Sequence, residues 1–241
     1  MFVGSIVPVS PLIYDAKDTA TVDPGTSAMP ISPARCDAIL FDVDGVILDS
    51  KANMAAAWAA VRAQTGTSIS FEAYFSEIGR PFADIMARLG LASKAPEIER
   101  VFRTTSAAVM AETPIYAGIG EVLKTLAAAN IKLGIVTSKD ATRTGLVLDR
   151  LPVEFQCVTS PRPDLRGKPA PDCLLYTIAK LNIDPAHCFY IGDMDSDELA
   201  AARAHVPYAH VSWGYGDSRD PDIPILQTPE DILSLTGLVK P

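Results

Sequence analysis

From Cys36 onward, short apolar runs alternate with stretches whose apolar residues recur at helical spacing. Five runs have the length and composition of buried parallel strands, at 38–43, 131–136, 155–158, 188–193 and 208–212. Between them, 119–126 and 174–181 have the spacing of helices that bury one face, and Asn130 and Asn182 are placed to end them. This alternation predicts an α/β fold with a doubly wound, Rossmann-like parallel sheet. Such sheets bind ligands outside the carboxyl ends of their strands.

One region breaks the alternation, because residues 51–116 carry only helical signals. It begins with the alanine-rich stretch 51–66 and continues with a helical stripe through Ile98, Val101 and Phe102. A helical insertion after the first strand predicts a cap domain. The predicted division is therefore a catalytic core of residues 36–50 and 117–241 with a helical cap at 51–116.

The first 35 residues differ from the rest of the chain. They are rich in proline, serine and threonine, lack periodicity, and have no basic segment of the kind that opens a secretory signal. We interpret 1–35 as an extended or disordered leader. Met29 offers an alternative start of translation, so residues 1–28 need not belong to the native protein.

Composition narrows the possible functions. With 48% hydrophobic and 21% charged residues, the chain is too apolar for disorder, and its net charge of −8 disfavours nonspecific binding to nucleic acid or anionic membranes. No apolar run approaches the roughly 18–20 residues of a membrane span. The four cysteines lie far apart, which indicates reduced thiols and a cytoplasmic protein. Either a monomer or a homodimer is compatible with this composition.

The first predicted strand ends in two aspartates, Asp42 and Asp44. Because side chains alternate along a strand, both point to the same side, and Gly45 then allows a sharp turn. Two carboxylates this close repel each other, and either a shared proton or a metal ion relieves the repulsion. An Asp-Gly turn with a capping aspartate is the simpler alternative.

Polar groups also follow the other strands. The candidates for chemistry are Thr137, Ser138, Lys168, Asp193 and Asp197. Each has an ordinary explanation, such as a helix cap or an acidic first helical turn. Their coincidence at neighbouring strand ends indicates one site instead. Four further basic residues could meet an anionic substrate, but the sequence does not rank them: Lys51, Arg80, Lys139 and Arg166.

Four segments, FDVDGVILDS, IVTSK, GKPAPD and IGDMDSD, occur in the order of the four motifs of the haloacid dehalogenase superfamily. The chain resembles its phosphoglycolate phosphatase-like branch, whose members carry a helical cap. The resemblance implies an Mg²⁺-dependent phosphatase that hydrolyses a small phosphate monoester, such as phosphoglycolate or a sugar or polyol phosphate. The reaction would proceed through an aspartyl-phosphate.

The resemblance also implies residue roles. Asp42 would be the nucleophile, and Asp44 would protonate the leaving oxygen and later accept a proton from water. Thr137, Ser138 and Lys168 would bind the phosphoryl group. The implied metal ligands are Asp42, the backbone carbonyl of Asp44, and Asp193, with Asp197 holding or orienting a metal-bound water.

Two alternatives stay open. A sugar phosphomutase resembling β-phosphoglucomutase would share the motifs, but those mutases carry a cap histidine where this chain has Met54 and an arginine where it has Phe82. A catalytically silent homologue that only binds phosphate is the second. The retention of Asp44 favours phosphate ester hydrolysis, because dehalogenases and phosphonate hydrolases of the superfamily lack this aspartate.

Overall fold

The computed structural model describes residues 35–218 and 220–238. The leader predicted at the amino terminus therefore lies outside the described residues, apart from Arg35.

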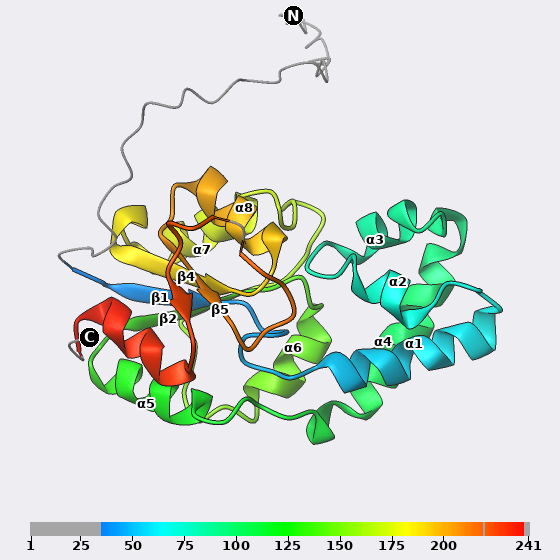
Figure 1. Cartoon of the computed structure of the whole chain (residues 1–241), viewed down its shortest axis with the longest axis horizontal. Helices are drawn as coiled ribbons and strands as arrows, with labels where there is room; N and C mark the ends of the chain where they lie inside the picture. The colour runs from blue at the N-terminus through cyan, green and yellow to red at the C-terminus, as the bar shows by residue number, and fades with distance from the viewer. Residues whose placement is uncertain (1–34, 219, 239–241) are drawn as a thin grey trace, which may run out of the picture.

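A single sheet of six parallel strands forms the centre of the molecule, in the order β3-β2-β1-β4-β5-β6 (Figure 1). The strands are β1 Ala38–Phe41, β2 Lys132–Val136, β3 Cys157–Thr159, β4 Cys188–Gly192, β5 Tyr208–Val211 and β6 Ile225–Leu226. This confirms the predicted parallel sheet. The two-residue strand β6 was not predicted, because so short a segment has no periodicity to recognise.

Helices cover both faces of this sheet, as the pattern of β1 requires. Ile39 and Phe41 face a hydrophobic core shared with helix α5 (Ile119–Ala128), whereas Ala38 and Leu40 face a core shared with α7 and α8. The remaining helical elements of this part are α6 Ala141–Leu148, α7 Asp172–Leu181, α8 Asp195–Ala204, and the 3₁₀ segments η3 Pro185–His187 and η4 Pro229–Thr236. Because both faces are buried, the strands read as continuous apolar runs.

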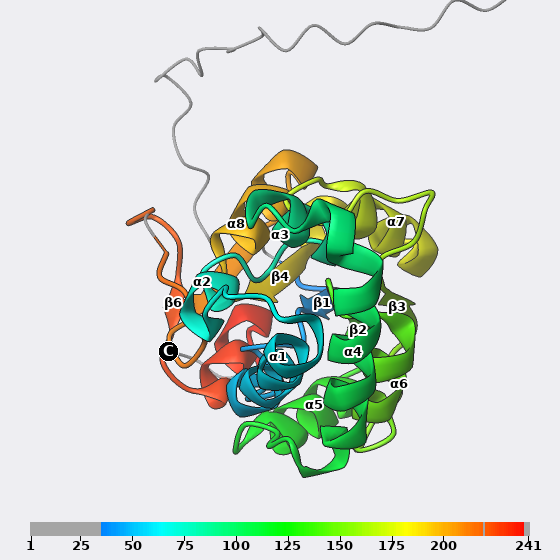
Figure 2. The same ribbon diagram turned by 90° about the vertical axis from the view of Figure 1, so that its right-hand side faces the viewer.

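A second group of helices lies beside the sheet, at the carboxyl ends of its strands (Figures 1 and 2). It comprises α1 Lys51–Thr65, α2 Phe71–Phe75, α3 Phe82–Arg88 and α4 Ala95–Ala108, with the short segments η1 Ala92–Lys94 and η2 Met110–Glu112. These helices pack around a hydrophobic core of their own, in which Trp58 stacks on Tyr74 with ring centroids 4.3 Å apart. The predicted helical cap is therefore present.

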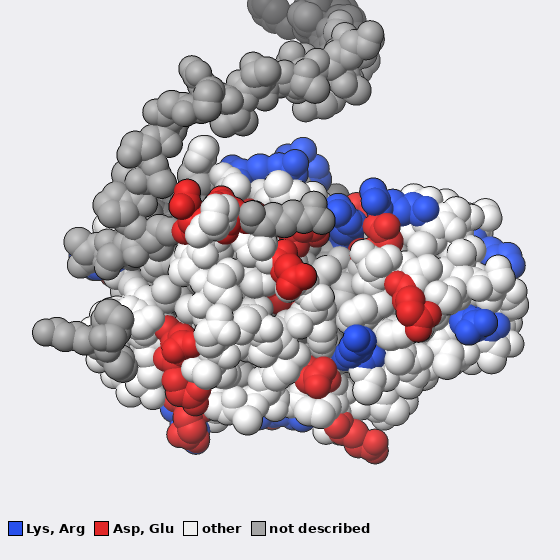
Figure 3. Space-filling view, in the orientation of Figure 1, with Lys and Arg blue, Asp and Glu red and all other residues white. Residues whose placement is uncertain are grey.

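The surface carries both signs of charge. On the face shown in Figure 3, acidic and basic side chains are scattered among large uncharged areas. Within the described part of the chain, no helix combines the length and apolarity needed to cross a membrane. The four cysteines are free thiols, and three of them are buried.

Candidate active site

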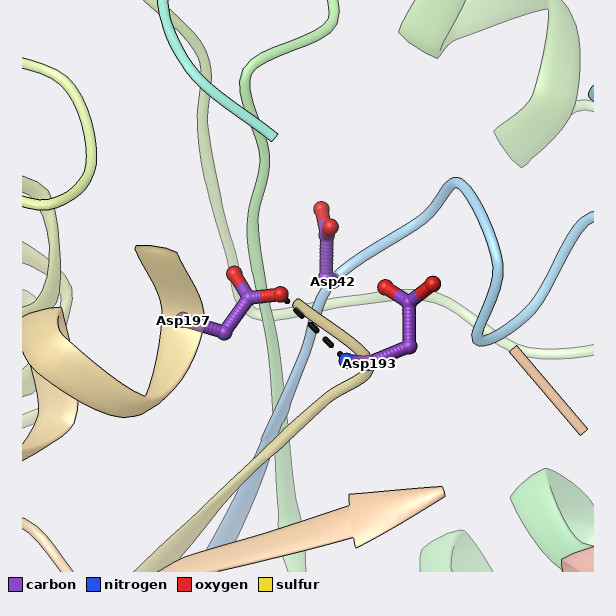
Figure 4. Close-up of side chains that lie close together, drawn as sticks. All are labelled: Asp42, Asp193 and Asp197. Atoms are coloured by element: carbon purple, nitrogen blue, oxygen red, sulfur yellow. Dashed lines mark hydrogen bonds between the residues drawn. The ribbon is translucent and has the colours of Figure 1, made fainter. Parts of the chain in front are cut away.

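Three aspartates converge where β1 and β4 end. These strands are parallel neighbours, so Asp42 and Asp193 leave the sheet side by side, and Asp197 joins them from the first turn of α8 (Figure 4). One carboxylate oxygen of each residue lies within 4.8 Å of the others, and all three side chains are buried. The predicted meeting of acidic groups at adjacent strand ends is therefore observed.

Asp197 is held by donors on every side. Its Oδ2 accepts hydrogen bonds from the backbone N–H groups of Asp193 (3.3 Å) and Met194 (3.1 Å) at the start of α8. Its Oδ1 accepts from the Tyr190 hydroxyl (2.9 Å) and lies 2.6 Å from Lys168 Nζ. Asp197 therefore anchors the other groups of the site through a complete set of hydrogen bonds.

Lys168 joins two of the carboxylates. Its ammonium is also 2.9 Å from Asp42 Oδ2, and the side chain is almost fully buried. Burial opposes the charge on Lys168, but the carboxylates of Asp197 and Asp42 raise its pKa above the ordinary value. Burial also raises the pKa of Asp42 to about 6, since the nearby carboxylates add to the effect and Lys168 offsets it only in part.

The cluster retains uncompensated negative charge. Three carboxylates face one ammonium, and the buried oxygens Asp42 Oδ1 and Asp193 Oδ1 have no hydrogen-bond partner among the described residues. Burial, together with Asp197 and Asp42, raises the pKa of Asp193 well above its usual range. A buried, unpaired carboxylate oxygen is destabilising, and a cation with oxygen ligands compensates it. The cluster can therefore bind a metal ion.

Asp44 has a different environment from Asp42. Lys139, which is buried, places its Nζ 2.9 Å from Asp44 Oδ1. Burial alone would raise the pKa of Asp44, but Lys139, together with Ser50, brings it below the ordinary value. The two aspartates also contact different ammonium groups, since Asp42 shares Lys168 with Asp197 and Asp44 contacts Lys139.

Thr137 and Ser138 follow β2 and lie at the same edge of the sheet. Thr137 Oγ1 accepts a hydrogen bond from the backbone N–H of Lys139 at 3.2 Å. The Ser138 hydroxyl donates to the Gly79 carbonyl oxygen (2.9 Å), which also accepts from the Ser196 hydroxyl (3.1 Å). Ser138 is thus engaged with the loop between α2 and α3 in this structure.

A cavity of about 210 Å³ lies between these strand ends and the helices of the cap. Its floor includes Asp42, Asp44 and Thr137, and its other wall includes Tyr74, Phe82 and Phe102. A small molecule in this cavity would touch both the aspartates and the cap helices.

Two contributors were missed by the sequence analysis. The backbone N–H of Tyr215 donates to Asp193 Oδ2 (2.8 Å), and its hydroxyl accepts from the backbone N–H groups of Ser50 (2.6 Å) and Lys51 (3.1 Å). Tyr215 thereby links the acidic cluster to the start of α1. Tyr190, from the centre of β4, donates to Asp197 and also accepts from Lys168 (3.2 Å). The one available signal was their position on or just after a predicted strand.

The fold and the cluster define an α/β protein with a helical cap and a buried acidic site, and comparison with known proteins identifies its family. The family model for haloacid dehalogenase-like hydrolases matches residues 39–211. A phosphoglycolate phosphatase of Xanthomonas campestris pv. campestris is 28% identical over 185 residues, covering 74% of this chain and 84% of the relative. An N-acetylmuramic acid 6-phosphate phosphatase of Pseudomonas aeruginosa is 30% identical over 190 residues, covering 75% and 84%.

A solved structure shows the same fold. The crystal structure of a hydrolase from Pseudomonas syringae covers 83% of this chain and 96% of its own, with a TM-score of 0.75 and 22% identity. The chain therefore belongs to the haloacid dehalogenase-like hydrolase family, in the branch that resembles phosphoglycolate phosphatases, and it is a hydrolase of phosphoric monoesters. This confirms the family inferred from the four motifs.

Proposed function

We propose that the protein is an Mg²⁺-dependent cytoplasmic phosphatase that hydrolyses a small phosphate monoester, such as phosphoglycolate or a sugar or polyol phosphate, through an aspartyl-phosphate. The observation that carries this proposal is the position of Asp42. It lies on the floor of the cavity beside Asp193, and one of its buried carboxylate oxygens has no partner among the described residues.

The donor set fits magnesium. Asp42, Asp193 and the backbone carbonyl of Asp44 would hold the ion, and Asp197 would orient a water bound to it. These are the oxygen ligands that Mg²⁺ prefers. When bound, the ion supplies the positive charge that lets a phosphate dianion approach buried carboxylates.

In the proposed reaction, a carboxylate oxygen of Asp42 attacks phosphorus in line, and the bond from phosphorus to the ester oxygen breaks. Asp44 donates its proton to the departing oxygen and then removes a proton from the water that hydrolyses the aspartyl-phosphate. Lys168, Thr137 and Ser138 would bind the phosphoryl oxygens. Because Lys139 holds Asp44 ionised in this structure, the acid role requires a weaker contact with Lys139 in the substrate complex.

The cavity wall favours a phosphatase over a sugar phosphomutase. Met54 and Phe82, which stand where such mutases carry a histidine and an arginine, both line the cavity. Two apolar side chains there can neither transfer a proton to a sugar hydroxyl nor bind a second phosphate. We retain the proposed division into a core of 36–50 and 117–241 and a cap of 51–116, with the cap excluding water from the site.

The test is phosphate release from a panel of phosphate monoesters, with and without Mg²⁺ and without any bisphosphate. We expect turnover that requires the metal and is abolished in Asp42→Asn, while the exposed control Asp195→Asn retains it. Product isomerisation dependent on a bisphosphate would identify a mutase. Stabilisation by phosphate with no turnover of any ester would identify a silent homologue.

A further inference from the structure

Tyr74 brings a polar group to the cavity wall. The side chain is 4% exposed and lines the cavity, and no hydrogen bond among the described residues uses its hydroxyl. Its ring is fixed by stacking on Trp58 and by contact with Phe102, with centroids 4.3 Å and 5.3 Å away. The hydroxyl oxygen is not among the buried side-chain atoms that lack a partner, so it is accessible at the cavity wall, where a ligand can form a hydrogen bond with it.

Apolar side chains form part of the cavity wall together with Tyr74. Ile78, Phe82, Ile85 and Phe102 also line the cavity, and three of the four are buried. A ligand group in contact with these side chains would displace water from an apolar surface. This wall therefore favours a leaving group with an apolar face.

The cations that line the cavity are already paired with carboxylates. Lys139 lies 2.9 Å from Asp44, and Arg143 lies 2.5 Å from Asp140. Arg103 pairs with Glu99 and lies 3.6 Å from Asp140, and Arg80 lies 3.3 Å from Asp195. An anionic leaving group would have to displace one of these carboxylates or lie beside it.

From these three observations we propose that the cap selects a phosphate ester with a neutral leaving group. That group packs an apolar face against Phe82 and Phe102 and forms a hydrogen bond with Tyr74 Oη. This inference rests on the proposed phosphatase function and narrows it. It places esters of neutral alcohols ahead of esters whose leaving group carries a carboxylate.

Three matched esters test this: 3-hydroxymethylbenzyl, 3-methylbenzyl and 3-carboxybenzyl phosphate, whose leaving oxygens have the same benzylic environment. The wild-type protein with Mg²⁺ should hydrolyse the hydroxymethyl ester with the highest kcat/KM and the carboxy ester with the lowest. Tyr74→Phe should lower kcat/KM for the hydroxymethyl ester about 10-fold, mainly through KM, and leave the methyl ester unchanged.

The outcomes are distinguishable. A carboxy ester hydrolysed as fast as the hydroxymethyl ester, or an equal effect of Tyr74→Phe on all three esters, would overturn the inference while leaving the phosphatase intact. Thermal melting of Tyr74→Phe checks that the fold is retained. No release of phosphate from any ester would refute the phosphatase function and this inference with it.

Discussion

The acidic cluster should make the metal-free protein less stable as the pH rises, and Mg²⁺ should reverse the loss. The pKa of Asp42 is raised from 3.8 to about 6 by burial and the neighbouring carboxylates. The native state therefore binds this proton more tightly than the unfolded chain does. The stabilisation is complete below about pH 4 and is lost as the pH rises through about 6.

The size of the effect follows from the same pKa. Ionising Asp42 in the native state at a pKa of about 6 instead of 3.8 removes roughly 3 kcal/mol of unfolding free energy. Roughly half of this loss falls between pH 5 and pH 7.5, which corresponds to about 3–6 °C in Tm for a protein of this size. Asp193, whose pKa is also raised, acts in the same direction.

The assay is thermal unfolding after treatment with a chelator, at pH 5 and pH 7.5, with and without Mg²⁺. Saturating Mg²⁺ should raise Tm more at pH 7.5, because binding no longer competes with protonation of Asp42. At 100 times its dissociation constant the ion adds about 2.7 kcal/mol. In Asp42→Asn the Asp42 share of the pH dependence should disappear, whereas Asp195→Asn should behave as wild type.

An equal increase in Tm on adding Mg²⁺ at pH 5 and pH 7.5 would contradict this reasoning. So would a metal-free wild type whose Tm difference from Asp42→Asn is the same at pH 5 and pH 7.5. Either result would mean that the carboxylates of the cluster are already compensated without a divalent cation.

Three substitutions test other parts of the site. Lys168→Met should lower the unfolding free energy by roughly 3 kcal/mol in urea unfolding, because Asp42 and Asp197 lose their buried partner. Gly45→Ala should weaken Mg²⁺ binding at least about 10-fold by calorimetry, since the residue has φ +84° and its added methyl would collide with the Asp193 carboxylate. Tyr190→Phe should lower the unfolding free energy by about 1 kcal/mol, because its hydroxyl bonds to Val136 and Asp197. An unchanged midpoint of urea unfolding would show that this hydroxyl does not stabilise the fold.

Most of the sheet could be predicted from the sequence because its strands are buried on both faces. A continuous apolar run predicts the strand, and the polar residues that follow it, such as Asp42 and Asp193, mark the strand end that carries the site. The ends of two helices could also be predicted from the sequence. Asn130 and Asn182 adopt φ of 60° and 50° just beyond α5 and α7. Leu175 lies in the predicted helix 174–181 but is 44% exposed, because the pattern does not fix which apolar residue faces outward.

The partners of the candidate site residues could not be predicted in the same way. Whether Lys139 is an exposed lysine or a buried ion-pair partner depends on how the segment after β2 packs against Asp44, and a sequence motif does not record this packing. The same holds for Ser138, whose hydroxyl contacts Gly79 from the distant cap segment. Long-range contacts of this kind are decided by tertiary structure.

The two aspartates that follow β1 have opposite electrostatic environments. Asp42 is buried beside other carboxylates, which raises its pKa, whereas Asp44 is paired with Lys139, which lowers it. A bound cation would favour the ionised form of Asp42, which the proposed nucleophile needs, and withdrawing Lys139 would favour the protonated form of Asp44, which the proposed acid needs.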